Sequence, residues 1–308
     1  MFKLKPAYKN YIWGGTRLVG EYGKKPDALP LAESWELSAH EHGQSAISGG
    51  AYDGMEFGAY LREHPEAAGL KPGEPFPVLV KLIDAAQPLS VQVHPNDAYA
   101  MEHENSKGKT ELWYILDAEP GAFLYLGLER AVAREEFLRH MESGSVEKLL
   151  RRAYVKPGEA YMVEAGTLHG IGKGIVLAEV QQSSDITYRV YDFGRRGADG
   201  NPRPLHLAQA LDAADLSAKA VAPQKTSPRK RGVWPIAENR YFSVSGVRVK
   251  GSLDIPAKAA SFQALLCTQG VIFANGLELS KGETAFLSAG EGCGLRGEGM
   301  LLLIAAGA

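Results

Sequence analysis

Val78-Leu79-Val80-Lys81-Leu82-Ile83 is a short apolar run, and Leu89-Ser90-Val91-Gln92-Val93-His94-Pro95 follows it closely. Runs of this length indicate β-strands, and Pro95 ends the second one because proline cannot donate to a strand ladder. Side chains two positions apart in a strand point to the same face, so Gln92 and His94 are expected side by side. The two runs therefore predict a β fold with a polar pair at the end of a strand.

Further short apolar runs follow at regular intervals. The chain contains 35 glycines and 17 prolines, which separate these runs as turns. We expect strands at 111–116, 123–126, 161–163, 175–182 and 186–193. Many short strands joined by such turns are typical of a β-sandwich or a jelly-roll barrel. The sequence therefore predicts a mainly β protein.

Three stretches depart from the strand pattern. In Met55–Arg62 the apolar residues recur at helical spacing. The segment 134–152 carries two apolar stripes separated by Gly144, which predicts two short helices within a small helical insertion at about 129–152. The segment 205–211 is a third helical candidate.

A change of composition divides the chain. We expect a first domain at 1–216, a linker at 217–234 and a second β domain at 235–308. The linker includes the basic run Ser227–Arg231, which suits either an anion-binding or nucleic-acid-binding patch or a solvated linker, and so short a run favours the linker. The second domain contains no histidine, so it offers no imidazole-based metal site.

The overall composition restricts the class of protein. With 308 residues, 45% hydrophobic and 23% charged, the chain can bury a sizeable core. A net charge of -2 does not support a general polyanion-binding surface, so we expect a local phosphate site at most and no nucleic-acid partner. We expect no membrane association, because no apolar span of about 18 residues occurs and the first residues lack a signal-peptide core. Two cysteines are too few for a disulfide framework, which predicts a cytoplasmic protein with reduced thiols, and the oligomeric state is not fixed by the sequence.

Four residues suit a metal site. His94 shares a strand face with Gln92, His169 ends an apolar run that begins after a glycine, and Glu111 lies between them in the chain. Two neutral imidazoles, one carboxylate and one amide oxygen form a ligand set for a divalent metal such as zinc. The set contains no thiolate, which argues against a closed structural zinc site. Five other histidines are weaker candidates: His103, His140 and His206 lie in polar or helical contexts, and the contexts of His40 and His42 are intermediate.

The segment that ends in His169 resembles the second signature of the cupins. Gly158, Gly166 and His169 fall at its glycine and histidine positions, while Glu164 stands in place of the usual proline. The first cupin signature usually begins His-x-His, and here Gln92 stands in place of the first histidine. The resemblance implies a cupin-type barrel.

The departures from the cupin pattern match a particular family. Several motifs in order closely resemble the type I phosphomannose isomerases: Tyr11–Gly15, Glu33–Ser38, Gln92–Asp97, Gly108–Tyr114, Ala165–Gly172 and Val180–Asp192. The resemblance covers most of 1–215, and the chain length resembles that of the short bacterial form.

This resemblance implies a fold and an activity. The fold would be mainly β, with two cupin-like jelly-roll barrels and a small helical insertion. The activity would be a zinc-dependent aldose–ketose isomerisation of mannose 6-phosphate and fructose 6-phosphate through a metal-stabilised enediol-type intermediate. By motif match, one zinc ion per chain would be held by Gln92, His94, Glu111 and His169.

The resemblance also implies roles beside the metal. Arg189 falls at the family's catalytic arginine, and Lys109 and Ser90 fall at positions that line the active site. Lys109 lies two residues before Glu111, so a continuous strand would place both on the metal face. Lys81 either reaches the substrate phosphate or extends to the barrel edge.

The general base stays open at this point: a zinc-bound water, a carboxylate and Lys109 are all candidates, with Glu36, His40 and Asp185 as further participants. Two other functions compete with the implied isomerase. One keeps the fold and the metal but assigns a different phosphosugar. The other is a sugar-binding cupin without turnover, which would not need Lys109 and Arg189 beside the metal.

Overall fold

Strand β5 (Val78–Ala85) is buried along its whole length because both faces of its sheet are covered. Val80 and Leu82 pack into one apolar core, and Ile83 and Ala85 pack into another. This is the alternation expected of a strand, with apolar layers on both sides. It explains why the run that predicted the strand is almost uninterrupted.

The computed structural model describes residues 1–197 and 200–307, and its strands form three antiparallel sheets. The six-stranded sheet contains, in spatial order, β10 (Ala160–Val163), β7 (Glu111–Ala118), β12 (Ile175–Gln182), β5, β3 (Glu33–Leu37) and β2 (Ala7–Lys9). The five-stranded sheet contains β13 (Tyr188–Tyr191), β6 (Val91–Val93), β11 (His169–Ile171), β8 (Phe123–Leu128) and β9 (Leu150–Tyr154). The eight-stranded sheet contains β14 (Gly232–Glu238), β15 (Phe242–Ile255), β19 (Cys293–Ala306), β16 (Gln263–Ala274), β18 (Thr284–Leu287), β1 (Phe2–Lys5) and β4 (Ala46–Ser48), with β17 (Leu277–Ser280) paired to β16.

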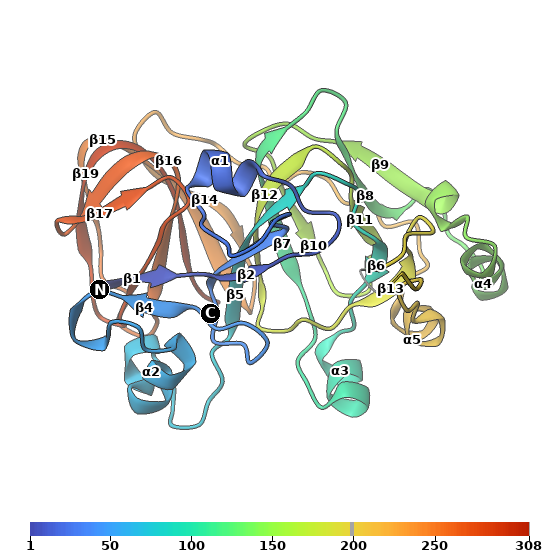
Figure 1. Ribbon diagram of the computed structural model, residues 1–308, viewed down its shortest axis with the longest axis horizontal. Coiled ribbons are helices and arrows are strands. Elements are labelled where there is room, and N and C mark those ends of the chain that lie inside the picture. The colour runs from blue at the N-terminus through green and yellow to red at the C-terminus, as the bar shows by residue number, and fades with distance from the viewer. Residues whose placement is uncertain (198–199, 308) are drawn as a thin grey trace.

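The six-stranded sheet is the middle layer of the molecule. One of its faces packs on the five-stranded sheet, with Trp113 and Leu177 meeting Leu124 across the core between them. Its other face packs on the eight-stranded sheet, where Val80 shares a core with Phe286. Figure 1 shows the result as two β lobes side by side, the C-terminal lobe in orange and red. The expected mainly β, cupin-like fold is confirmed.

The N-terminal strands cross between the two lobes. β1 pairs with β18 and with β4, so residues from the start of the chain complete the C-terminal sheet. The predicted linker has no regular structure until β14 begins at Gly232, and its basic side chains Arg229 and Lys230 are exposed. The division into domains stays a prediction. The first strands of the chain belong to the sheet of the C-terminal half, so the two halves are not separate in sequence.

The helices are short and lie at the edges of the sheets (Figure 1). They are α1 (Arg17–Tyr22), α2 (Phe57–Glu63), α3 (Asp97–Glu104), α4 (Arg134–Glu142) and α5 (Leu207–Ala213), with single 3₁₀ turns η1 (Gly50–Tyr52), η2 (Pro65–Ala68) and η3 (Val146–Leu149). α2, α4 and α5 lie where the sequence predicts helices. Among the described residues, no helix is both long and apolar enough to cross a membrane.

One expected helix is replaced by a turn and a strand. The second helix predicted before residue 152 is the 3₁₀ turn η3, and Leu150 already begins β9. β9 pairs with β8, and its side chains alternate in burial along the strand. Pairing with the sheet edge therefore overrides the local helical spacing.

A buried ion pair joins the N-terminal segment to the C-terminal sheet. The Lys24 ammonium lies 2.6 Å from Glu36 Oε1, and both side chains are buried. Glu36 also accepts hydrogen bonds from Ser34, at 2.6 Å, and from Thr284 of β18, at 3.4 Å. Burial raises the pKa of Glu36 in spite of the ion pair. Glu36, a candidate participant in proton transfer, is thus part of the scaffold.

We expect Lys24→Met to lower the free energy of unfolding at pH 7 by about 3–5 kcal/mol, because it leaves a buried carboxylate unpaired. The pKa of Glu36 is raised in the folded state, so Glu36 becomes protonated in the folded protein before it does in the unfolded chain. The loss of stability should therefore shrink as the pH falls from 7 toward about 4.3, the pKa of glutamate in the unfolded chain. Denaturant unfolding at pH 7 and at pH 5 measures both effects. The exposed neighbour provides the control: Lys25→Met should change stability by less than about 0.5 kcal/mol. Equal stability of the Lys24 variant and the parent at pH 7 would contradict this role.

Candidate metal centre and active-site cavity

A cross-strand row on the five-stranded sheet brings together residues from distant parts of the chain. Arg189 of β13 lies opposite Gln92 of β6, and Gln92 lies opposite His169 of β11. Directly opposed residues in antiparallel strands point to the same face of the sheet. The register therefore aligns these three side chains on the face that meets the six-stranded sheet.

A second row crosses the six-stranded sheet. Trp35 lies opposite Lys81, Lys81 opposite Glu179, and Glu179 opposite Trp113. Glu111 lies two residues before Trp113 on β7 and therefore shares its face. This row supplies charged groups to the space between the two sheets, where the remainder of the core is apolar.

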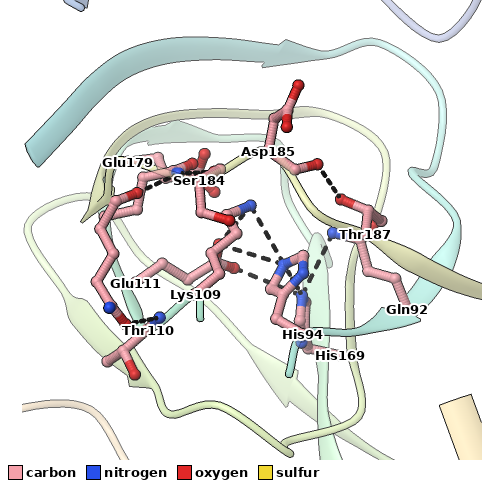
Figure 2. A network of polar contacts seen from close by, with 12 residues as sticks. Gln92, His94, Lys109, Thr110, Glu111, His169, Glu179, Ser184, Asp185 and Thr187 are labelled. Carbon is pink, nitrogen blue, oxygen red and sulfur yellow. Dashed lines mark hydrogen bonds and ion pairs between the residues drawn. The ribbon is translucent and has the colours of Figure 1, made fainter. Parts of the chain in front are cut away.

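The two sheets bring a buried cluster of His94, His169 and Glu111 to one point, as Figure 2 shows. The Nε2 atoms of His94 and His169 lie 3.2 Å apart. Glu111 Oε2 lies 3.4 Å from His94 Nε2, and Glu111 Oε1 lies 3.5 Å from His169 Nε2. Three potential ligand side chains thus face a common centre.

The outer nitrogens of both imidazoles are fixed by the backbone. His94 Nδ1 lies 2.8 Å from the Ile186 carbonyl oxygen, and His169 Nδ1 lies 2.7 Å from that of Thr167. A carbonyl oxygen only accepts, so each Nδ1 carries the proton and donates it, and each Nε2 lone pair faces the centre. Burial lowers the pKa of His94 to about 3 and also lowers the pKa of His169. Both rings are therefore neutral, as metal ligands must be.

Glu111 supplies negative charge to the centre. Burial alone would raise its pKa, but the charge of the Lys109 ammonium opposes burial, and the pKa of Glu111 lies well below its ordinary value. Its Oε1 is buried and has no hydrogen-bond partner. Two lone-pair nitrogens and a buried acceptor oxygen that lacks a donor fit a divalent cation of the zinc type.

Gln92 and Lys109 border this cluster. Gln92 Nε2 lies 3.3 Å from His169 Nε2, while its Oε1 accepts from Ser90 at 3.2 Å. Half a turn of the amide group would present the oxygen to the centre instead. The Lys109 ammonium lies 2.9 Å from Glu111 Oε2 and 3.2 Å from His94 Nε2, so a lysine from outside β7 does reach the predicted metal face.

A cavity of about 250 Å³ opens beside the cluster. Five residues selected from the sequence line it, namely Lys81, Ser90, Gln92, Lys109 and Arg189. Asp185 also lines it, and at the rim its carboxylate lies 2.6 Å from His42 Nδ1 and 3.6 Å from His40 Nε2. Glu36 is not among the lining residues.

Lys81 does not extend to the barrel edge, which was one of its two predicted placements. Its ammonium is buried in the cavity floor, 3.1 Å from Glu179 and 3.5 Å from Glu33. Burial alone would lower the pKa of Lys81, but the two carboxylates raise it above its ordinary value, so the side chain stays charged. The indole nitrogens of Trp35 and Trp113 donate to the same two carboxylates.

Arg203 joins Arg189 in the cavity lining, and the sequence analysis did not select it. Arg189 donates to the Pro204 carbonyl at 3.1 Å, and its buried Nε has no hydrogen-bond partner. Burial and the charge of Arg203 lower the pKa of Arg189. Arg203 lies outside any strand, so neither alternation nor an apolar run could indicate where its side chain points.

Comparison with known proteins gives consistent matches. Residues 1–119 match the family model for the catalytic domain of type I phosphomannose isomerase. The chain is 39% identical over 279 residues to the probable mannose-6-phosphate isomerase GmuF of Bacillus subtilis, covering 89% of this chain and 88% of that protein. A crystal structure of the mannose 6-phosphate isomerase from Bacillus subtilis superposes with a TM-score of 0.90 at 35% identity, over 98% of both chains. A mannose 6-phosphate isomerase bound with zinc and yttrium shares the fold, with a TM-score of 0.78 at 21% identity over 100% of both chains.

We expect the purified chain to bind one divalent metal ion. His169→Ala should weaken zinc binding at least about 100-fold, because loss of a residue that only hydrogen-bonds to a metal ligand already costs about 10–100-fold in metal affinity, and loss of a ligand should cost more. Competition with a chromophoric chelator measures the dissociation constant. His103→Ala, on the exposed side of α3, is the control and should bind like the parent. Full zinc occupancy of the His169 variant at parental affinity would remove His169 from the ligand set.

Proposed function

We propose, because the chain belongs to the type I phosphomannose isomerase family, that it interconverts mannose 6-phosphate and fructose 6-phosphate with one zinc ion per chain. The observation that carries the proposal is the buried convergence of His94 Nε2, His169 Nε2 and the Glu111 carboxylate beside a charged cavity. A site of this size suits a phosphosugar, a small polar substrate.

Gln92, His94, Glu111 and His169 would hold the zinc ion. Three of these ligands are neutral and one is an anion, so the bound ion would keep a formal charge of about +1. As a Lewis acid, it would stabilise the negative charge that builds on the sugar oxygens in the enediol-type intermediate. The absence of thiolates from the set preserves that charge.

Lys109 would act on the same oxygens. Its ammonium lies 2.9 Å from the carboxylate of Glu111, one of the proposed metal ligands. Moving a carbonyl between C1 and C2 develops an oxyanion, and a positioned ammonium in a buried site stabilises it. We assign the transfer of the proton between the carbons to three of the ionisable groups that line the cavity, Lys109, Glu179 and Asp185.

Arg189 and Arg203 would bind the phosphate. Both line the cavity, and the unpaired Nε of Arg189 is a donor without an acceptor. Arginine suits phosphate because its planar fork of donors matches the phosphate oxygens. The charge of Lys81 is balanced by Glu33 and Glu179, so we assign Lys81 and Ser90 to the sugar hydroxyls.

We expect the zinc-loaded chain to convert mannose 6-phosphate to fructose 6-phosphate in a coupled assay, and a chelator to abolish this turnover. A panel of other aldose phosphates in the same assay tests the choice of sugar. Full metal loading with no turnover of mannose 6-phosphate would contradict the proposed function. Turnover of a different phosphosugar alone would keep the isomerase and replace its substrate.

Arg189→Ala should lower kcat/KM at least about 100-fold, because it removes a cavity cation that meets the charged substrate. Zinc affinity should stay at the parental value, since Arg189 is not one of the proposed ligands. The matched control is Arg139→Ala on the exposed side of α4, which should leave kcat/KM unchanged. Parental turnover in the Arg189 variant would exclude this arginine from the reaction.

A further inference from the structure

One carboxylate joins the C-terminal sheet to the metal-binding half of the molecule. Asp97 is the first residue of α3 and lies two residues after Pro95. Its Oδ2 accepts a hydrogen bond from the Tyr241 hydroxyl at 2.7 Å and from Arg240 at 3.0 Å. Tyr241 and Arg240 come from the turn between β14 and β15, far from the metal centre in sequence.

The other oxygen of Asp97 contacts the segment that leads to Glu111. Asp97 Oδ1 accepts from the Gly108 backbone N–H at 3.0 Å and from the Gln182 side-chain amide at 2.8 Å. Four donors from three separate parts of the chain thus meet on one carboxylate. Hydrogen bonds to a charged acceptor are about twice as strong as neutral ones, so the contact is well suited to fix a position.

Gln182 passes this constraint on to Thr110, which lies between Lys109 and Glu111. The Thr110 N–H donates to Gln182 Oε1 at 2.9 Å, and the Gln182 N–H donates to the Thr110 carbonyl at 3.1 Å. Thr110 is therefore held from both sides by one glutamine. Its neighbours supply the ammonium and the carboxylate of the metal centre.

The same segment has little room to shift. A Cβ atom added to Gly108 would lie 2.5 Å from the Asn96 carbonyl carbon and the Asp97 nitrogen. The Lys109 N–H donates to the Pro95 carbonyl at 3.0 Å, directly after the ligand His94. A movement of Asp97 would therefore carry Lys109 and its neighbours with it.

Tyr241 is itself held in place. Asn239 Oδ1 accepts from the Tyr241 N–H at 2.8 Å, and the Tyr241 carbonyl accepts from Gly307 at 3.0 Å. The Arg240 guanidinium lies over the Tyr241 ring, 4.6 Å from its centre. The hydroxyl is thus presented to Asp97 by a hydrogen-bonded turn of the C-terminal sheet.

We infer that Tyr241 and Asp97 are positioning residues, through which the C-terminal sheet holds Lys109 and Glu111 in register with His94 and His169. The C-terminal half, which supplies no metal ligand, would then set the metal affinity and the turnover of a site in the other half. The kinetic part of this inference rests on the proposed isomerase activity, whereas the metal-affinity part does not.

The test uses three variants: Tyr241→Phe removes one hydroxyl, Asp97→Ala removes the carboxylate that accepts all four hydrogen bonds, and the double variant combines the two. Asp97→Ala should lower kcat about 10–100-fold, because small misplacements of catalytic groups cost that much, and should weaken zinc binding about 10-fold or more. Tyr241→Phe should lower kcat by about 3–10-fold in the parent and have no further effect in the Asp97→Ala background. The KM for mannose 6-phosphate should change less than kcat, since neither residue lines the cavity.

The matched control is Tyr161→Phe, which removes an equivalent bond of 2.8 Å from a tyrosine hydroxyl to the Glu159 carboxylate. It should leave zinc affinity and kcat unchanged. If Tyr241→Phe lowers only the melting temperature, with parental zinc affinity and kcat at 25 °C, its role is structural and the inference is overturned. Additive losses in the double variant would overturn the route through Asp97. If the parent itself shows no turnover, the proposed function fails, and the zinc affinities alone decide the inference.

Discussion

Two imidazole lone pairs face each other across 3.2 Å in a buried site, and the rest of the structure is arranged around this constraint. The backbone carbonyls of Ile186 and Thr167 fix it, because each accepts a hydrogen bond from the outer nitrogen of one imidazole ring. Neutral lone pairs at this distance repel unless a positive group lies between them. The Glu111 carboxylate supplies the negative charge that a cation-binding centre needs, and the cavity beside the centre gives it access to a substrate.

Burying charged groups in such a centre costs free energy, because they lose their contacts with water. An unpaired carboxylate inside a protein is strongly destabilising, so Glu111 needs the Lys109 ammonium that lies 2.9 Å from it. Apolar cores cover the six-stranded sheet on both faces. The C-terminal sheet covers one face of the six-stranded sheet. Through Asp97 it also contacts Gly108, directly before Lys109 and the start of β7.

Much of this arrangement could be predicted from the sequence. The apolar runs indicated β5, β7 and β12, and the alternation of side chains along a strand placed Gln92 beside the candidate metal ligand His94. Pairing between strands could not be predicted, since the register of β13 on β6 that brings Arg189 opposite Gln92 depends on contacts between distant segments. For the same reason the sequence did not indicate that Lys81 lies between Glu33 and Glu179, nor that Arg203 reaches the cavity from a loop. Where local and long-range preferences conflicted, as at Leu150, pairing with the sheet prevailed.

The central claim is that one metal ion at this centre is required for turnover of a phosphosugar. Titration of the metal-free protein with zinc, with the isomerisation of mannose 6-phosphate followed at each addition, tests it most directly. Turnover should be absent at the start, rise in proportion to added zinc and level off at one equivalent per chain. Equal turnover in the metal-free and zinc-loaded protein would contradict the claim.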